Sequence, residues 1–290
     1  MSEPKKLNSI WTMSDSAKET AELFRTFTPG TPDLIPTGIR TLDTATGGLE
    51  PATVLIIGAT TGVGKSMVMQ SALQCNQASG VKTGGVSLED APGVFGCRVL
   101  ARASQVDSVK IRTKTFNSSE LLMLEQGQMD LERDAKSPHS SLIAYNIGGS
   151  LEAVLKSLEA LADAGCKLIY VDYIQKIKGS HDDRKTEVSR AFSEMQRVAA
   201  EKRIALAVLS QVSRQQDEAK VPSIRALKET GDLENEARMI LMLAKNGDGV
   251  HGVLRKSTFG AEGTKVHWNR GPCGTLFEQL EDGETDDDDF

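Results

Sequence analysis

The chain has 290 residues, of which 39% are hydrophobic and 26% are charged, a composition typical of a folded globular protein. Its formal net charge is -6, and seven acids lie in the last ten residues, EDGETDDDDF, so the rest of the chain is close to neutral. A near-neutral body still leaves room for local basic loops, and binding to nucleic acid stays compatible with this composition.

Neither the cysteines nor the hydropathy pattern indicates a secreted or membrane protein. The opening residues, MSEPKKLNSI, lack the apolar core of a signal peptide, and no apolar run reaches the roughly 18 residues of a membrane span. The cysteines are not spaced as metal-binding or redox pairs, so we expect reduced thiols at Cys75, Cys97, Cys166 and Cys273. These features predict a cytoplasmic protein without a membrane segment.

Three regions are expected along the chain. Residues 1–35 form an N-terminal segment with a short helix at 14–27, which Ser14 or Asp15 caps, followed by a linker rich in proline and glycine. Residues 36–278 form the main domain. Residues 279–290 form a disordered acidic tail.

Short apolar segments alternate with helix-length segments from residue 40 onward. The predicted strands cover residues 53–59, 82–89, 140–147, 167–174, 204–212, 237–244, 251–258 and 264–269. The predicted helices cover residues 66–79, 95–105, 118–136, 150–165 and 187–203. Several strands are apolar on both faces, which predicts an α/β fold with a mostly parallel central sheet flanked by helices.

The segment ATTGVGKS fits the phosphate-loop pattern, except that alanine replaces the first glycine. It lies between a predicted strand and a predicted helix. Glycine at the two later positions lets backbone N–H groups face a phosphate, the lysine adds charge, and the serine can bind magnesium. We expect a nucleoside triphosphate to contact Ala59, Thr60, Thr61, Gly62, Val63, Gly64, Lys65 and Ser66.

Three polar residues lie near the ends of other predicted strands and would complete a hydrolytic site. Asp172 ends the apolar segment LIYVD, from which it would hold Mg²⁺ together with Ser66. Glu89 follows the second strand, which we expect at the next position along the edge from the phosphate loop, and is the candidate base that orients water. Gln211 ends another strand and would sense the γ-phosphate of ATP.

These motifs, in this order, resemble the ATPase domain of DnaB-type replicative helicases, including phage-type and free-standing ones. VSLED resembles the family's Ser-Leu-Glu motif, VDYIQKI its Asp-Tyr-Leu-Gln strand, and LSQVSR its Leu-Ser-Gln strand. IRALKETGDLENEARMILML is similar to the family's Leu-Arg-Glu-Ser-Gly stretch. The resemblance covers about residues 36–277 and implies a RecA-like core, ATP with Mg²⁺, and a bacterial or phage-infected cell.

The resemblance also implies partners. We expect a motor without the collar or primase domain of the family, in which the helix at 14–27 would dock on a neighbouring subunit to close a homo-hexameric ring. Single-stranded DNA would contact the loop ALKETGD and nearby basic residues, with candidates Lys228, Glu229, Gly231 and Arg214. Lys176 and Lys178 add further basic character. Such binding is directed at the DNA backbone and is therefore sensitive to salt.

One departure from the family concerns the cation that a neighbour supplies to the transferring phosphoryl group. The family has Lys-x-Arg on a late strand, whereas here Lys256 is followed by Thr258 at the arginine position. Arg255 is adjacent but alternates to the opposite face of a regular strand, although a one-residue bulge could bring it into place. Arg270 is a second candidate, and a slow or regulated ATPase is the alternative.

The function that the sequence favours is a ring-forming, ATP-dependent replicative helicase that translocates on single-stranded DNA, with hydrolysis at subunit interfaces. A RecA-like recombinase or mediator would share the same catalytic motifs. A degenerate ATPase that acts as a replication scaffold or loader is the third interpretation, because of Thr258.

The acidic tail resembles the aromatic-ended tails of short-tailed phage primase-helicases and of bacterial single-strand-binding proteins. Its acids would steer it to a basic surface, and the terminal ring would enter a small pocket of a replicative polymerase, a primase or another replisome protein. The candidate partner-binding residues are Asp286, Asp287, Asp288, Asp289 and Phe290.

Overall fold

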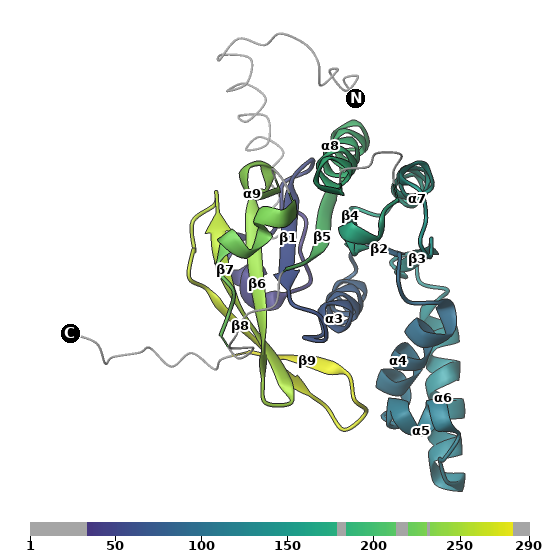
Figure 1. The fold of residues 1–290 in the computed structure, drawn as a ribbon. Coiled ribbons are helices and arrows are strands. Elements are labelled where there is room, and N and C mark those ends of the chain that lie inside the picture. The colour runs from purple at the N-terminus through teal and green to yellow at the C-terminus, as the bar shows by residue number, and fades with distance from the viewer. Residues whose placement is uncertain (1–33, 179–183, 213–219, 231–232, 281–290) are drawn as a thin grey trace, which may run out of the picture.

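The computed structural model describes residues 34–178, 184–212, 220–230 and 233–280 (Figure 1). The predicted helix at 14–27 and residues 281–290 of the predicted acidic tail lie outside the described residues, whereas Gln279, placed in that tail by the prediction, belongs to β9. The elements α2 to β9 fall within the region predicted to form the main domain, and β9 ends one residue beyond its expected boundary.

A single mixed sheet of nine strands runs through the described residues, in the order β3-β2-β4-β5-β1-β6-β7-β8-β9. Six strands are parallel: β1 (Val54–Ala59), β2 (Thr83–Ser87), β3 (Leu142–Tyr145), β4 (Leu168–Asp172), β5 (Ala205–Gln211) and β6 (Met239–Asn246). Three antiparallel strands follow at one edge: β7 (Gly249–Ser257), β8 (Lys265–Arg270) and β9 (Leu276–Gln279). The predicted mostly parallel α/β sheet is confirmed.

Helices cover both faces of the sheet, as strands buried on both sides require. All six residues of β1 are buried, because their side chains alternate between two apolar clusters. One cluster joins the sheet to α7 (Leu151–Asp163), α8 (Arg184–Lys202) and α9 (Leu233–Glu236), with the 3-10 segment η2 (Ile224–Thr230) beside them. The other joins it to α2 (Arg40–Thr46) and α3 (Lys65–Ala78).

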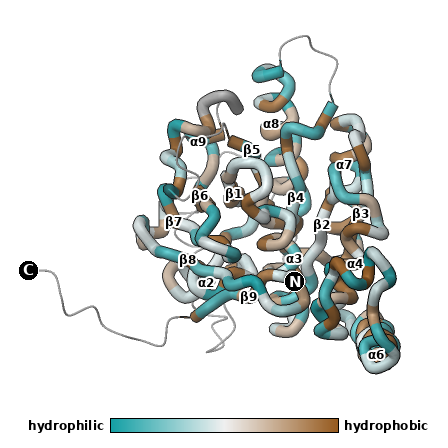
Figure 2. Tube along the Cα trace, turned by 60° about the horizontal axis from the view of Figure 1, so that its bottom comes forward, coloured by the Kyte–Doolittle hydropathy of each residue, from teal (hydrophilic) through white to brown (hydrophobic). Residues whose placement is uncertain are grey.

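Three further helices connect β2 to β3 and project from the sheet beside its β3 edge (Figure 1). They are α4 (Pro92–Ser104), α5 (Ser108–Thr113) and α6 (Ser118–Asp134). Asn117 and Glu120 form a capping box that starts α6. Figure 2 shows α6 at the periphery of the molecule, where its outer apolar residues Leu122 and Met129 are exposed.

The sequence did not predict α2, α5 or β9. These elements are short, and long-range polar contacts fix two of them: the Glu278 carboxylate of β9 accepts hydrogen bonds from the backbone N–H groups of Arg40 and Thr41, each at 2.9 Å. Behind α2, the buried Tyr170 hydroxyl donates to the Thr37 carbonyl at 2.6 Å. Local periodicity carries no signal for such contacts, which join residues far apart in the chain.

Candidate functional site

The phosphate-loop segment connects the carboxyl end of β1 to the amino end of α3, as its motif requires. Gly62 and Gly64 have φ values of 82° and 115°, in the region that favours glycine. A side chain at Gly64 would come within 3.4 Å of Val250 on β7. Thr61 and Gly62 are exposed, so the outer part of the loop is open to a ligand while α3 begins directly behind it.

Lys65 lies at the centre of this loop. Its ammonium donates hydrogen bonds to the carbonyls of Ala59 at 3.0 Å and Thr60 at 3.2 Å. Burial lowers the pKa of Lys65, and the nearby carboxylates of Asp172 and Glu89 oppose that shift. The side chain therefore combines a fixed position with attraction to acidic groups on two other strands.

Asp172 lies at the end of β4 and is only 2% exposed. Burial raises the pKa of its carboxyl to about 6, and the charges of Asp90 and Glu89 act in the same direction. A hydrogen bond with Ser66 and the charge of Lys65 partly offset this effect. The structure thus brings together Ser66 and Asp172, the two residues predicted to bind magnesium.

This pair fits a magnesium ion by its chemistry. Mg²⁺ prefers hard oxygen ligands and usually keeps several waters, so one hydroxyl and one carboxylate from the protein are enough. The buried Asp172 carboxylate beside the Ser66 hydroxyl supplies that donor set. Among the residues that the structure describes, no cluster of three or more His, Cys, Asp or Glu suits a metal that needs a full protein cage.

Glu89 follows β2 and lies beside β4, since Ser87 pairs with Asp172 in the sheet. The expectation that β2 occupies the position next to the phosphate-loop strand is wrong, because β4 and β5 lie between β2 and β1. The Glu89 side chain is 48% exposed and forms an ion pair with Lys176 at 3.6 Å. It therefore faces solvent at the same edge of the sheet as the phosphate loop, where a candidate base is needed.

Gln211 ends β5, directly beside β1, since Ala59 pairs with Gln211. Its backbone is held by Gln175, whose side-chain oxygen accepts from the Gln211 N–H at 3.0 Å and whose side-chain nitrogen donates to the Gln211 carbonyl at 2.9 Å. The same nitrogen contacts the Ser210 hydroxyl at 2.9 Å. Gln175 thus links the segment after β4 to the end of β5. The sequence analysis assigned it no role, although the motif DYIQ contains it.

Arg255 lies in a β-bulge of β7. Ile240 pairs with Lys256 and Leu241 pairs with Leu254, so Arg255 has no partner on β6. A bulge of this kind interrupts the alternation of side chains along the strand. A one-residue bulge is the change expected to let Arg255 replace the arginine missing at Thr258, and the structure contains one.

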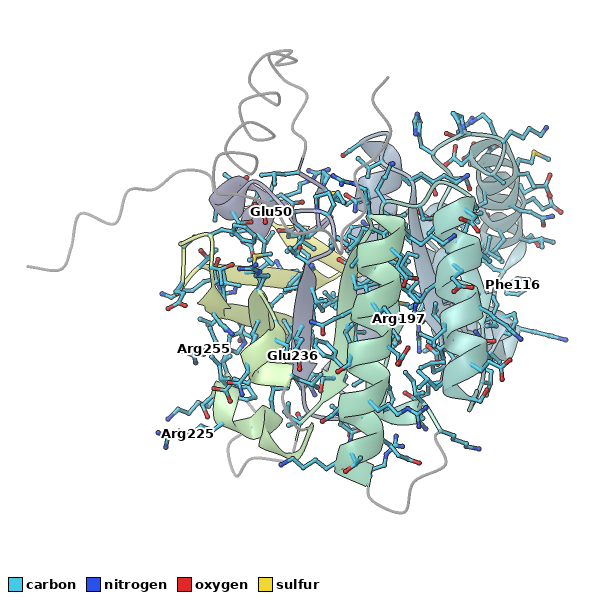
Figure 3. All side chains as sticks on the ribbon, turned by 90° about the horizontal axis from the view of Figure 1, so that it is seen from above. Glu50, Phe116, Arg197, Arg225, Glu236 and Arg255 are labelled. Carbon is cyan, nitrogen blue, oxygen red and sulfur yellow. The ribbon has the colours of Figure 1, made fainter. Side chains whose placement is uncertain are left out.

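The contacts of the two cations show that they reach the same face of the sheet. Arg255 donates to the carbonyl of Val221 at 3.3 Å, and Lys256 donates to the carbonyl of Glu234 at 2.7 Å. Val221 and the α9 segment both pack on the α8 side of the sheet. Figure 3 shows Arg255 on the same side of the molecule as Glu236 and Arg225.

Arg255 and Lys256 lie at the opposite end of the sheet from the phosphate loop. Ser257 pairs with Met239, and Met239 pairs with Leu55 near the amino end of β1, whereas the loop follows the carboxyl end of β1 at Ala59. Figure 1 shows α9 and α3 at opposite ends of the central strands. These two cations therefore cannot reach the loop of their own chain without rearrangement of the sheet.

Arg270 is placed differently. Its guanidinium donates to the carbonyls of Asp248 and Gly274, both at 3.1 Å, and so joins the turn after β6 to the turn before β9. Both turns lie at the phosphate-loop end of the sheet, since Val250 and Leu276 approach Gly64. Of the two substitutes for the missing arginine, only Arg255 lies at the far end with Lys256.

The structure describes only part of the region predicted to bind DNA. Lys228 and Glu229 belong to η2, but their side chains lie outside the described part of the structure. Gly231 and Arg214 also lie outside it, as do Asp286 to Phe290 of the tail. No helix within the described ranges is long and apolar enough to cross a membrane.

The fold and the site define a RecA-like P-loop nucleotide-binding domain: a parallel sheet, a phosphate loop after its central strand, and a buried acid at the end of β4. The family model of the DnaB-like helicase C-terminal domain matches residues 35–264. The chain belongs to this family, as its resemblance predicted.

Curated relatives include the replicative DNA helicase DnaC of Bacillus subtilis, 27% identical over 222 residues, which are 73% of this chain and 47% of that protein. A probable plasmid replicative DNA helicase of Chlamydia psittaci is 25% identical over 217 residues, 73% of this chain and 46% of that protein. The chain therefore spans about half the length of the curated relatives it matches.

Solved structures show the same fold. The ATPase domain of a phage helicase matches with a TM-score of 0.79 at 20% identity, over 94% of this chain and 100% of that one. A DnaB-like replicative helicase, studied with its interactions with primase, matches with a TM-score of 0.74 at 20% identity, over 90% of this chain and 65% of that one. The RadB recombinase matches with a TM-score of 0.50 at 19% identity, over 83% of this chain and 98% of that one.

The raised pKa of Asp172 predicts a pH-dependent stability difference between the wild-type protein and the variant Asp172→Asn. Below the ordinary pKa of 3.8 the carboxyl is protonated whether the chain is folded or unfolded, so the variant gains nothing there. As pH rises to about 6 and beyond, the buried charge costs the wild-type protein stability that the variant keeps, up to about 3 kcal/mol.

Urea unfolding between pH 4 and 7, with a chelator and without nucleotide, measures this difference. Glu152→Gln is the control of opposite sign, because Lys156 lowers the pKa of Glu152 and the stability that this pair contributes is lost as pH falls. A difference between Asp172→Asn and the wild-type protein that stays constant across this pH range contradicts the prediction.

Proposed function

We propose that this chain is the motor of a ring-forming, ATP-dependent replicative DNA helicase, which translocates on single-stranded DNA and unwinds duplexes. The observation that carries the proposal is the division of the catalytic groups between two ends of the sheet. The phosphate loop, Asp172, Glu89 and Gln211 lie at the carboxyl end, whereas Arg255 and Lys256 lie at the other. Such a chain would complete its site with a head-to-tail neighbour, and head-to-tail contacts close into a ring when the rotation permits.

Each group then has a defined task in ATP hydrolysis. The loop N–H groups and Lys65 hold the phosphates, while Ser66 and Asp172 would hold a magnesium ion, which would neutralise phosphate charge. Glu89 orients and activates the attacking water. Gln211 contacts the γ-phosphate, and the hydrogen bonds from Gln175 couple its position to the segment after β4.

DNA and partner contacts complete the proposal. The η2 region, with Lys228, Glu229 and Gly231, steps along the DNA backbone, and Arg214 adds charge. The helix at 14–27 docks on the adjacent subunit of a homo-hexamer, and the assembly works in the cytoplasm of a bacterium or a phage-infected cell. Residues 286–290 bind a replicative polymerase, a primase or another replisome protein.

The alternatives account for fewer observations. A recombinase shares the fold, but residues 35–264 match the family model of a helicase domain. A degenerate ATPase scaffold was suggested by Thr258. The bulge at Arg255 offers a substitute for the missing arginine, so Thr258 alone no longer favours a degenerate ATPase.

Strand displacement on forked DNA tests the function. The wild-type protein is expected to unwind the fork with ATP and Mg²⁺, whereas Lys65→Ala loses nucleotide binding, and Glu89→Gln binds nucleotide but turns over at least about a hundredfold more slowly. Binding of a fluorescent ATP analogue separates the two variants. Equal unwinding by the wild-type protein and Lys65→Ala, or DNA-bound helical filaments in place of rings in micrographs, would refute the helicase proposal.

The trans arrangement predicts different effects of the two arginines. Arg255→Ala is expected to reduce DNA-stimulated ATP turnover by roughly 10³-fold or more, as loss of an arginine finger does elsewhere. Arg270→Ala is the matched control at the other end of the sheet and should change turnover far less. Mixed rings of Arg255→Ala and Lys65→Ala subunits should recover part of the activity, because some interfaces then hold both intact groups. No recovery on mixing argues against action in trans.

The tail is tested by removal of Phe290 alone. Loss of binding to the DNA polymerase of the same replication system, measured by surface plasmon resonance, is the expected result, with ATP turnover unchanged. Phe290→Tyr is the control, since it keeps an aromatic ring and the terminal carboxylate. Unchanged polymerase binding after removal of Phe290 leaves the tail without this role.

A further inference from the structure

A cavity of about 420 Å³ lies beside Glu89 at the carboxyl end of β2 and β4. We call it the Glu89 cavity. It holds one carboxylate and three cationic side chains, and its lining residues are Leu88, Glu89, Ile147, Gly148, Gln175, Lys176, Lys178 and Arg184. The catalytic scheme above uses Glu89 and Gln175 but gives the cations no task.

Lys176 is the cation that contacts the candidate base. It ends the 3-10 segment η1 (Ile174–Lys176), directly after β4, and its ammonium lies 3.6 Å from the Glu89 carboxylate. The Tyr173 ring lies 5.6 Å away, and Tyr173 and Glu89 both raise the pKa of Lys176, which stays charged. The ammonium is therefore held between the base and the residue that follows the magnesium-binding strand.

This ion pair is weak enough to be exchanged. The side chains of Lys176 and Glu89 are 39% and 48% exposed, and pairs with such exposure contribute little to stability. A lysine with three rotatable donors can move from one oxygen anion to another without strain. A competing anion in the cavity would meet no large barrier to taking Lys176 from Glu89.

The other two cations favour such an anion. The Lys178 ammonium lies beside Gly148 in the cavity wall, since a Cβ atom at Gly148 would be only 3.4 Å from it. Arg184 donates to the carbonyl of Ile177 at 2.8 Å and pairs with Glu187 at 2.6 Å, which fixes its guanidinium at the rim. A cavity lined by three cationic side chains and one carboxylate suits a phosphodiester better than a cationic or an apolar ligand.

We propose that the Glu89 cavity binds a phosphodiester of single-stranded DNA, and that this binding moves Lys176 from the Glu89 carboxylate to the DNA phosphate. Without DNA, the Lys176 ammonium, 3.6 Å from the Glu89 carboxylate, holds that carboxylate away from the attacking water. With DNA, the carboxylate is released toward the attacking water. DNA binding is thereby linked to ATP turnover within one subunit. The inference rests on the proposed role of Glu89 as the base.

The test compares ATP turnover with and without oligothymidylate for the wild-type protein and Lys176→Met. The variant is expected to turn over ATP about two- to five-fold faster without DNA, the range that an exposed ion pair supports, with an unchanged KM for ATP. Its stimulation by DNA falls by the same factor. Lys176→Arg should restore the wild-type behaviour.

Lys202→Met is the matched control, because Lys202 forms an ion pair with Asp163 at 2.7 Å, remote from the Glu89 cavity. It should leave turnover and DNA stimulation unchanged. An unchanged or slower DNA-free rate in Lys176→Met overturns the inference. Sodium sulfate that stimulates the wild-type protein as strongly as DNA overturns the assignment to nucleic acid.

The variant Glu89→Gln separates the two proposals. If it keeps wild-type turnover, the role of Glu89 as base fails, whatever Lys176→Met shows. If it loses turnover and the double variant with Lys176→Met is no faster, the two side chains act on one step, as proposed. If Lys176→Met speeds turnover equally in the Glu89→Gln background, Lys176 does not act through Glu89 and the inference is wrong.

Discussion

Parallel pairing of the central strands is the constraint on which the candidate site depends. Because β2, β4, β5 and β1 run in the same direction, their carboxyl ends meet at one edge of the sheet. Each strand then places one polar group there, although these groups lie far apart in the chain. The cost is that every parallel strand must be apolar on both faces, which the buried residues of β1 and β4 satisfy.

Several carboxylates lie close together at that edge of the sheet, and a cation there would stabilise their charged forms. The carboxylates of Asp172 and Glu89 act on the buried ammonium of Lys65, Asp90 acts on Asp172, and burial works against the charged forms of both Lys65 and Asp172. A magnesium ion bound between Ser66 and Asp172 would relieve this imbalance, and Lys176 already reduces it at Glu89. The same excess of carboxylates therefore supports both the magnesium site and the proposed movement of Lys176 from Glu89 to a DNA phosphate.

The antiparallel strands at the other edge serve a different purpose. They continue the sheet beyond β6 and return the chain to the amino end of the parallel strands, where the bulge of β7 places Arg255 beside Lys256. One continuous sheet thus holds the phosphate loop and the Arg255–Lys256 pair at fixed positions on opposite ends. In the proposed function these two ends meet between neighbouring copies of the chain.

The sequence by itself determined the α/β class, the extended central strands and the phosphate loop, because apolar runs and glycine spacing are local signals. It also pointed to Asp172, Glu89 and Gln211 as candidates, since each lies at or just beyond the end of a strand. Strand order was not accessible in this way, and the expected position of β2 was wrong, because order depends on crossovers and packing between distant segments. Only the tertiary structure decided that Gln175 holds Gln211, that Lys176 pairs with Glu89, and that a bulge at Arg255 interrupts β7, because these contacts join residues that no local pattern relates.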